Sequence, residues 1–574
     1  MMFSLRPKNI VRRTKDIAPD EIFLDAHNSP RFNRDQFEGR IERPIGRSAI
    51  WLFGIGTAAF LLLLTGRVFV LTVLDGVAYY EQSENNRLDN TILFAERGVI
   101  YDRNSVPLAW NELFETASTT TATTTAFEED FARRVYMDES GLSHVLGFVS
   151  YPKKDSAGNY FQTDMEGIAG IEKEYDEILK GSAGRTIVEE DALGTVVSTS
   201  VIDQPEAGTP LYLSIDNRVQ HELYERMKAL AGDVGFHGGA SAIIDVHTGQ
   251  MLALVSFPEY DSNVMTEGED NDLIATYQLD ETKPFLNRAI GGLYTPGSIM
   301  KPFFAVGALE EKIIDPMKTI FSDGALRVPN PYDPEHPTIF KDWKAHGAVD
   351  MRQALAVSSN VYFMTIGGGF GDQEGLGIAR LEEYARKFEI GELTGIDISG
   401  EVEGIIPSEK WKAKLFPDDP WRLGDTYNTS IGQYGFQATP LQMARAAAMI
   451  ANDGLLITPH LRMDSETGPT DRIGVSPESL QIVREGMRRS VMEGIAKALN
   501  VSYVNIAGKT GTAELGATKA NVNSWIMGFW PYENPQYAFA TVMEQGPATN
   551  LVGSAFVMRG LFDWMNQNAP EYFE

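Results

Sequence analysis

A long uncharged stretch near the N-terminus constrains this chain more than any other feature. From Ser48 to Gly66 there are 19 consecutive residues without a charged side chain. As a helix rising about 1.5 Å per residue, the stretch is about 28 Å long, close to the hydrocarbon thickness of a bilayer. A second apolar run, Val68–Leu74, follows Arg67, whose long side chain can reach toward an interface. We therefore expect residues 48–74 to form one transmembrane anchor.

Two other interpretations of this stretch fit less well. A buried core helix is normally shorter, and a cleaved signal peptide lies nearer the start and ends in small residues. Residues 1–47 carry ten Lys or Arg and seven acidic residues, whereas the remainder carries 40 basic and 72 acidic residues. By the positive-inside rule, we expect residues 1–47 to be a cytoplasmic tail, largely disordered up to residue 40. The protein is then single-pass in the inner (cytoplasmic) membrane, with the bulk outside the cytoplasm.

Composition excludes several classes of function. The formal net charge is −29, so a nucleic-acid backbone would be repelled and no nucleic acid is expected as a partner. The chain has no cysteine, which excludes disulfides, thiol catalysis and cysteine zinc sites. Its 574 residues are too many for one core and predict two to four folded units.

In the exported part, the sequence pattern changes near residue 206, which predicts a domain boundary there. Residues 75–205 are typical of a β-rich domain with short helices, with a strand entering a turn at 98–103 and one amphipathic helix over 171–179. The nearly all-Thr run 118–125 is compatible with an exposed strand or a flexible linker, and we favour the strand.

Residues 206–574 combine strands at both ends with helices between them. We expect a helix from Asp216 to about Leu230, strands over 240–245, 251–256, 525–530 and 538–544, and a helix around Met351–Met364. A helix and hairpin, then helices, then a second hairpin predict an α+β domain with a central antiparallel sheet and an inserted helical lobe.

Three short motifs carry the candidate chemistry. In Ser298-Ile-Met-Lys301, the i, i+3 spacing puts a hydroxyl and an amine on one helix face, and Pro302 indicates that the helix starts close to Ser298. Such a serine becomes a nucleophile if the lysine pKa is lowered by burial. The second motif is Ser358-Ser-Asn360. The third is Lys509-Thr-Gly-Thr512, where Gly511 on an edge strand would leave room for a substrate backbone.

Each motif alone has an ordinary explanation. These are a solvent-facing helix turn for the first, a polar patch between helix and loop for the second, and a turn for the third. Their order, with spacings of about 60 and 150 residues, resembles the serine acyl-transferase set of penicillin-binding proteins and serine β-lactamases.

The surrounding segments resemble class B penicillin-binding proteins more specifically. Those that carry the likeness are Glu96–Arg103, Gly170–Asp176, Asn287–Ile290, Tyr294–Ser298, Thr394–Asp397, Ser430–Gln433, Thr439–Gln442 and Ala507–Ala513. Lys341-Asp-Trp-Lys-Ala-His-Gly347 is more similar to the elongation type, penicillin-binding protein 2, than to the division type. The resemblance implies an elongated pedestal (dimerisation-type) domain at 75–205 and a transpeptidase domain at 206–574.

The resemblance also implies a function and roles for the motif residues. The expected function is peptidoglycan D,D-transpeptidation during cell-wall elongation, through a serine acyl-enzyme that β-lactams also form. Ser298 would be the nucleophile, Lys301 its base, Ser358 a proton relay, and Asn360 a substrate-positioning residue. Lys509 is counted with them as catalytic, and together with Thr510, Gly511 and Thr512 it would bind the terminal carboxylate. No cofactor or metal is implied. Expected partners are stem peptides, β-lactams, membrane lipid and a membrane-embedded glycan polymerase.

Two departures from the family pattern stand out. Only about 40 residues separate Arg103 from His144, where elongation-type relatives insert a larger head that contacts regulators. Some relatives also hold a structural zinc near the Asp-Trp segment through a cysteine. Because this chain has none, we expect the nearby acids and histidines to be surface polar residues. These residues are Asp333, His336, Asp342 and His346.

Other functions remain open at the level of sequence. The acyl-enzyme could be hydrolysed by water, as in a D,D-carboxypeptidase or a β-lactamase, although neither needs an anchor and a pedestal. A membrane-bound β-lactam sensor normally has a larger cytoplasmic effector than 47 residues allow. A non-catalytic scaffold of the wall-synthesis complex would not need all three motifs intact.

Overall fold

The computed structural model describes residues 46–77, 88–112, 131–156, 160–190, 196–330, 333, 335–465, 468, 471–516 and 518–574. The chain divides into two compact units, Met1–Leu88 and Asp89–Glu574, which are considered separately. The tail 1–40 and the Thr-rich run 118–125 lie outside the described residues.

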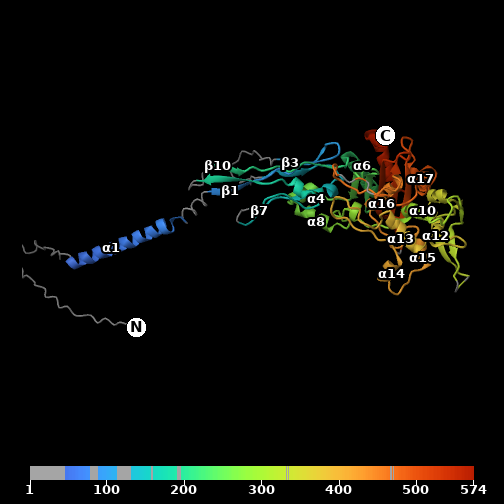
Figure 1. The fold of residues 1–574 in the computed structure, drawn as a ribbon, viewed down its shortest axis with the longest axis horizontal. Helices are drawn as coiled ribbons and strands as arrows, with labels where there is room; N and C mark the ends of the chain where they lie inside the picture. The colour runs from blue at the N-terminus through green and yellow to red at the C-terminus, as the bar shows by residue number, and fades with distance from the viewer. Residues whose placement is uncertain are drawn as a thin grey trace, which may run out of the picture. The chain divides into compact units, whose positions relative to one another are not determined.

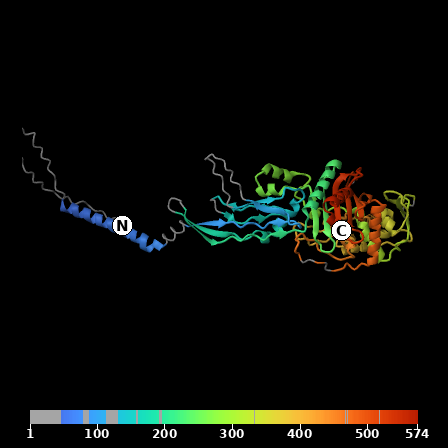
Figure 2. The ribbon, with the colours of Figure 1, turned by 90° about the horizontal axis from the view of Figure 1, so that it is seen from above.

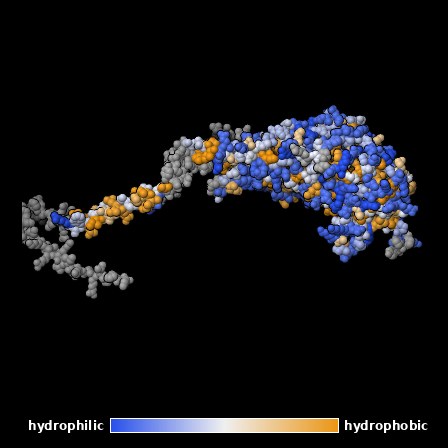
Figure 3. Space-filling view, in the orientation of Figure 1, coloured by the Kyte–Doolittle hydropathy of each residue, from blue (hydrophilic) through white to orange (hydrophobic). Residues whose placement is uncertain are grey.

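The first unit contains the expected apolar helix. It consists of α1 (Arg47–Phe69) and a continuing turn of π-helix, η3 (Val70–Leu74). Residues Ile50–Leu74 are long and apolar enough to cross a membrane, and none of them is buried inside the protein. Figure 3 shows apolar side chains along the visible face of this helix. The hydroxyls of Thr57, Thr65 and Thr72 each donate to the carbonyl four residues earlier, which satisfies these three hydroxyls within the helix itself.

The second unit begins with a β-rich domain, which we call the pedestal, built from short sheets (Figures 1 and 2). A three-stranded sheet has the order β1 (Leu88–Leu93), β9 (Gly184–Glu190), β10 (Val196–Asp203). A four-stranded sheet has the order β11 (Leu211–Tyr212), β2 (Ile100–Tyr101), β3 (Pro107–Glu112), β4 (Arg133–Tyr136). Two small hairpin-like pairs join β5 (Val149–Ser150) to β8 (Glu166–Gly167) and β6 (Lys153–Lys154) to β7 (Tyr160–Gln162).

The helix expected over 171–179 is two helices. After α3 (Ser143–Leu146), the chain forms α4 (Gly170–Glu174) and α5 (Asp176–Leu179), separated at Tyr175, whose ψ of 24° is not helical. The tyrosine hydroxyl donates to Asp397 in the other domain at 2.7 Å. A tertiary hydrogen bond therefore accompanies the interruption of this short helix.

A buried charge cluster holds the pedestal together. The carboxylate of Glu172 accepts a hydrogen bond from Arg97 at 2.6 Å and from Arg134 at 2.8 Å, and all three side chains are buried. Arg97 also donates to the backbone carbonyls of Met165 and Glu172. Burial raises the pKa of Glu172, but the two guanidinium groups outweigh it and hold the pKa below its usual value.

The transpeptidase-like domain is organised around a five-stranded antiparallel sheet. Its order is β13 (Met251–Phe257), β12 (Gly238–Asp245), β20 (Tyr537–Pro547), β19 (Asn521–Trp530), β18 (Ala507–Leu515). The strands expected at both ends of the domain thus meet in one sheet, with β18 at its edge. The expected helix after Asp216 is α6 (Asn217–Val234), and the Asp216 carboxylate caps it by accepting the N–H of Arg218.

Both faces of this sheet are covered by helices. On one face, α6 and α18 (Ser554–Asn568) pack with Ile243, Leu252 and Phe539. On the other, α16 (Pro440–Ala451) packs with Ala242, Ile244 and Met527. Alternate residues of each strand serve the two faces, so the strands are apolar throughout.

The remaining helices and strands form the inserted lobe and its surroundings. The helices are α7 (Ser262–Glu267), α8 (Asn271–Leu279), α9 (Arg288–Gly291), η4 (Gly297–Met300), α10 (Lys301–Glu310), α11 (Met351–Val357), α12 (Asn360–Gly368), α13 (Gly377–Lys387), α14 (Glu409–Leu415), α15 (Leu423–Thr429), α17 (Pro477–Met492), η5 (Lys497–Leu499) and η6 (Pro570–Phe573). The strands pair as β14 (Ile320–Ser322) with β17 (Gly347–Val349) and β15 (Ala325–Val328) with β16 (Thr338–Lys341). The single helix expected over Met351–Met364 is wrong, because α11 and α12 are separated at Ser358.

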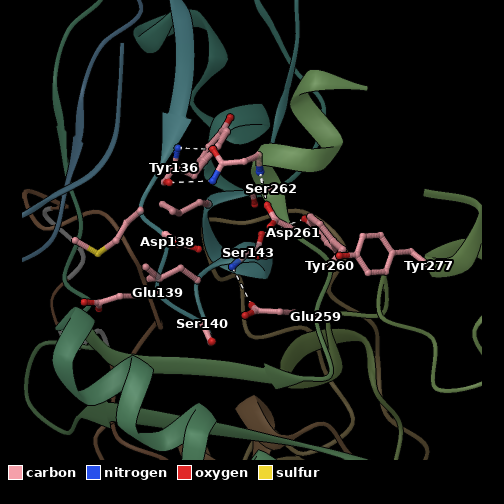
Figure 4. Close-up of a pocket in the computed structure, with 14 residues that line it drawn as sticks. Tyr136, Asp138, Glu139, Ser140, Ser143, Glu259, Tyr260, Asp261, Ser262 and Tyr277 are labelled. Atoms are coloured by element: carbon pink, nitrogen blue, oxygen red, sulfur yellow. Dashed lines mark hydrogen bonds between the residues drawn. The ribbon is translucent and has the colours of Figure 1, made fainter. Parts of the chain in front are cut away.

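A polar cavity lies where the pedestal meets the transpeptidase-like domain. It has a volume of about 190 Å³ and is lined by residues from both domains (Figure 4). The carboxylate of Glu259 accepts hydrogen bonds from the backbone N–H groups of Gly141 and Ser143, and burial raises the pKa of Glu259 to about 7. Because no lining residue belongs to the three motifs, this cavity is a junction between domains and not the candidate catalytic site.

Candidate active site

Ser298 lies in a single turn of 3₁₀-helix that leads directly into α10. The turn η4 starts at Gly297, whose φ of +60° favours glycine, and Pro302 occupies the first turn of α10. The expected helix start close to Ser298 is therefore confirmed. Ser298 is half-buried, whereas Lys301, one turn later, is completely buried.

The edge strand β18 lies against this turn. A Cβ at position 297 would lie 2.8 Å from the carbonyl oxygen of Thr512 in β18. Gly297 is also held by a different segment, because its N–H donates to the carbonyl of Gly432 at 3.0 Å. Likewise, a Cβ at Gly511 would lie 2.7 Å from the carbonyl oxygen of Pro296. Glycine at both positions lets the backbone of Ser298 and the Lys-Thr-Gly-Thr segment approach each other closely.

The second motif lies at the break between α11 and α12. Ser358 ends α11 with a left-handed backbone, φ 57° and ψ 43°, which a non-glycine residue rarely adopts. Ser359 then caps α12, because its hydroxyl accepts the N–H of Tyr362. The break places the side chain of Ser358 near both lysines and that of Asn360 near Lys301.

One hydroxyl lies between two buried amines. Lys301 Nζ donates to the backbone carbonyl of Ser358 at 2.8 Å and to Asn360 Oδ1 at 2.7 Å, and it lies 3.2 Å from Ser358 Oγ. Lys509 Nζ donates to the same Oγ at 2.8 Å and to the carbonyl of Thr510 at 2.7 Å. The three motifs, far apart in sequence, thus form one connected site.

The surroundings of both amines favour the neutral form. Burial lowers the pKa of Lys301 to about 7, with the negative charge of Asp342 opposing the shift. Burial, followed by repulsion from Lys301, lowers the pKa of Lys509 well below its usual value. A neutral amine next to hydroxyl groups is a general base, so the arrangement suits acyl transfer to a serine.

The four acids and histidines in and near the Asp-Trp segment divide into an exposed pair and a buried pair. Asp333 and His336 are exposed, as expected of surface polar residues. Asp342 and the side chain of His346 are instead buried, so the expectation that they lie on the surface is wrong. No sequence pattern indicates this burial, because one aspartate in an acidic chain resembles any other, and its burial depends on donors from other segments.

Comparisons with known proteins agree with this geometry. The penicillin-binding protein transpeptidase domain matches residues 239–561, and the penicillin-binding protein dimerisation domain matches residues 127–213. The chain is 29% identical to the peptidoglycan D,D-transpeptidase MrdA of Escherichia coli K12, covering 88% of this chain and 92% of that protein. It is 32% identical to MrdA of Salmonella typhimurium LT2, covering 75% of this chain and 72% of the relative.

Solved structures of penicillin-binding protein 2 have the same fold. The protein from Helicobacter pylori in complex with MreC superposes with a TM-score of 0.68 at 28% identity, covering 84% of this chain and all of that one. The protein from Pseudomonas aeruginosa in complex with WCK 5153 gives a TM-score of 0.64 at 30% identity, covering 83% of this chain and 98% of that one. The chain therefore belongs to the penicillin-binding protein family of serine-type peptidoglycan D,D-transpeptidases, within its elongation-type branch, penicillin-binding protein 2.

Proposed function

We propose that this protein cross-links peptidoglycan stem peptides through an acyl-enzyme on Ser298. The observation that carries this proposal is the hydroxyl of Ser358, which lies between the amines of Lys301 and Lys509. Lys301 itself follows Ser298 by three positions, about one helix turn. Burial lowers the pKa of Lys301 to about 7, which suits a base that must accept the Ser298 proton at neutral pH.

The reaction follows from these roles in two steps. Lys301 accepts the proton of Ser298, and Oγ attacks the carbonyl carbon of the D-alanyl-D-alanine bond. The backbone N–H groups of Ser298 and Thr512 stabilise the oxyanion. Ser358 passes a proton to the amine of the departing D-alanine, while Asn360 positions the substrate amide. The amine of a second stem peptide then attacks the ester, forms the cross-link and releases Ser298.

The edge strand supplies the substrate-binding groups. Lys509, Thr510, Gly511 and Thr512 bind the terminal carboxylate of the donor peptide, whose backbone lies along β18. A β-lactam presents a carboxylate and a reactive amide at a similar separation, so it acylates the same serine. The relative from Pseudomonas aeruginosa was solved in complex with the compound WCK 5153, which supports ligand binding by this protein fold.

The remaining assignments concern organisation and partners. We assign residues 1–47 to a cytoplasmic tail, 48–74 to the anchor, 75–205 to the pedestal and 206–574 to the transpeptidase domain. The charge difference between tail and bulk supports an inner-membrane protein with its catalytic domain outside the cytoplasm. Relatives solved with MreC and within a peptidoglycan synthase complex support assembly with a membrane-embedded glycan polymerase during elongation.

Two measurements test the proposal. A fluorescent penicillin should label the wild-type protein covalently and leave Ser298→Ala unlabelled; labelling of the variant would overturn the assignment of the nucleophile. Polymerised lipid-linked precursor with a partner polymerase should yield cross-linked dimers. Release of D-alanine without dimers would indicate a D,D-carboxypeptidase, and labelling without turnover would indicate a β-lactam sensor. Absence of both penicillin labelling and cross-linked dimers would indicate a non-catalytic scaffold.

A further inference from the structure

We infer that Asp342, which lies outside the three motifs, is a positioning residue that fixes Ser358 and Asn360 beside Lys301 without a metal ion. The inference rests on the proposed roles of Ser358 and Asn360 and explains what sets their geometry. Those two side chains flank a helix break with a rare backbone conformation, so an additional interaction must stabilise the break.

The carboxylate of Asp342 holds the start of α12. Its Oδ1 accepts the N–H of Asn360 at 2.9 Å, and its Oδ2 accepts the N–H of Val361 at 3.1 Å and the hydroxyl of Ser359 at 2.8 Å. These are N–H groups that a helix start leaves without partners inside the helix. A negative charge at this point is also favoured by the helix dipole.

The neighbours of Asp342 in the segment 341–343 contact the end of α11 and the side chain of Asn360. The indole Nε1 of Trp343 donates to the carbonyl of Val357 at 3.1 Å, and Asn360 Nδ2 reaches the carbonyl of Lys341 at 3.5 Å. Residues 341–343 therefore contact both helix ends next to Ser358. Moving this segment would move the hydroxyl that lies between the two lysines.

The donor set does not fit the zinc that some relatives hold here. Asp342 already accepts from Ser359, Asn360 and Val361, and also from Ser322 Oγ at 3.1 Å and from its neighbour's N–H at 3.0 Å. His346 Nε2 lies 3.5 Å from Asp342 Oδ1, but Asp333 and His336 are exposed and pair with each other. A structural zinc site needs about four ligands, and two are in place. Hydrogen bonds to one carboxylate carry out the positioning in this chain.

The charge of Asp342 also reaches the proposed base. It raises the pKa of Lys301 against the effect of burial, whereas the other cation facing Lys301, Lys509, is itself held toward the neutral form by burial. Around Asp342, burial lowers the pKa of His346, and Lys344 adds to that shift. Removing the negative charge should therefore make Lys301 neutral at lower pH.

The test compares Asp342→Asn, Asp342→Glu and the matched control Asp333→Asn, an exposed carboxylate nine positions earlier. The second-order rate constant for acylation by a fluorescent penicillin is measured from pH 5 to 9 in the detergent-solubilised full chain, alongside thermal unfolding. We expect Asp342→Asn to lower the plateau rate about 10- to 100-fold, since displacement by about 1 Å costs that much. Its acidic limb should move to lower pH by about half a unit or more. Asp342→Glu keeps the negative charge but moves the carboxylate. The acidic limb of its pH profile should therefore stay at the wild-type pH, while its plateau rate should fall.

Three results from the rates and pH profile of Asp342→Asn would overturn the inference. They are a wild-type rate in Asp342→Asn, a rate that falls only in proportion to the unfolded fraction, or an unshifted limb in Asp342→Asn. Addition of zinc that restores the Asp342→Asn rate would also contradict it. Labelling of Ser298→Ala would instead refute the proposed nucleophile, so the two failures are distinguishable. Asp333→Asn should match wild type throughout.

Discussion

The Nζ of Lys509 lies 2.8 Å from the Oγ of Ser358, although 151 positions separate the two residues in the chain. This contact joins the edge of the central sheet to the helix break of the lobe. It also brings a second amine next to the hydroxyl that faces Lys301, so the charge state of the site depends on how two buried amines titrate together.

The rate of acylation should therefore depend on pH in a defined direction. Lys301 must be neutral to act as a base, and burial lowers its pKa to about 7. Below that pH the amine is protonated and the rate falls, whereas above it the rate reaches a plateau. Second-order rate constants with a penicillin, measured across pH 5 to 9, should rise with an apparent pKa near 7. A limb near the ordinary lysine value of about 10 would contradict the role of Lys301.

Substituting Ser358 should separate activity from stability. Ser358→Ala and Ser358→Gly both remove the hydroxyl and should both lose most acylation and cross-linking. The left-handed backbone at this position disfavours a Cβ by about 1 kcal/mol. We expect the glycine variant to be the more stable of the two by about that amount in thermal unfolding. Equal stability of the two variants would show that the backbone conformation carries no cost.

Gly297 should be needed for the site, and a matched glycine should not. Gly297→Ala places a Cβ 2.8 Å from the carbonyl oxygen of Thr512, so β18 and η4 must separate. Acylation should fall at least tenfold. Gly371→Ala provides the control, because its φ of +59° is nearly the same as the +60° of Gly297, but open space surrounds the added Cβ. Both variants should lose stability through the positive φ, Gly297→Ala the more of the two because of its contact with Thr512, and only Gly297→Ala should lose its acylation rate.

Removing the buried carboxylate of the pedestal should destabilise that domain. Glu172→Gln leaves the guanidinium group of Arg134 buried without its carboxylate partner and leaves Arg97 paired with Asp176 alone, which costs about 3–5 kcal/mol. Differential scanning calorimetry should show a lower unfolding temperature, with penicillin labelling at low temperature retained. Glu174→Gln, on an exposed neighbour, should behave as wild type.

The stabilisation of the pedestal by this cluster should also depend on pH, and it should weaken in acid. The pKa of Glu172 is lowered in the folded state, so its stabilising contribution is present above the unfolded-state pKa of about 4.3. That contribution is lost as the pH falls through the folded-state pKa. Acid should therefore destabilise the wild-type pedestal more than the Glu172→Gln pedestal. Equal acid sensitivity would contradict the assignment.

Sequence reasoning succeeded where local pattern and fold agree. The apolar strands, the cap at Asp216 and the convergence of Ser298, Ser358 and Lys509 were predictable from periodicity, capping residues and motif order. The break at Ser358 was not, because Met351–Met364 has continuous helical character. The interruption is accompanied by hydrogen bonds that Asp342 accepts from the start of α12 and that Trp343 donates to the end of α11, and both residues belong to another segment. Tertiary contacts overrode local propensity there, as they did at Tyr175.

Among the strands that the structure describes, β18 pairs with one neighbour only, β19. A peptide that binds along the free edge of β18 would be recognised mainly through its backbone amide and carbonyl groups, which every residue has in common. If Lys509 binds the terminal carboxylate as we propose, discrimination between donor peptides concentrates at that end of the contact. Chemical variation in the middle of the peptide should be tolerated, and a changed terminus should be rejected. Inhibitor scaffolds can accordingly vary along the strand as long as they keep an anionic end.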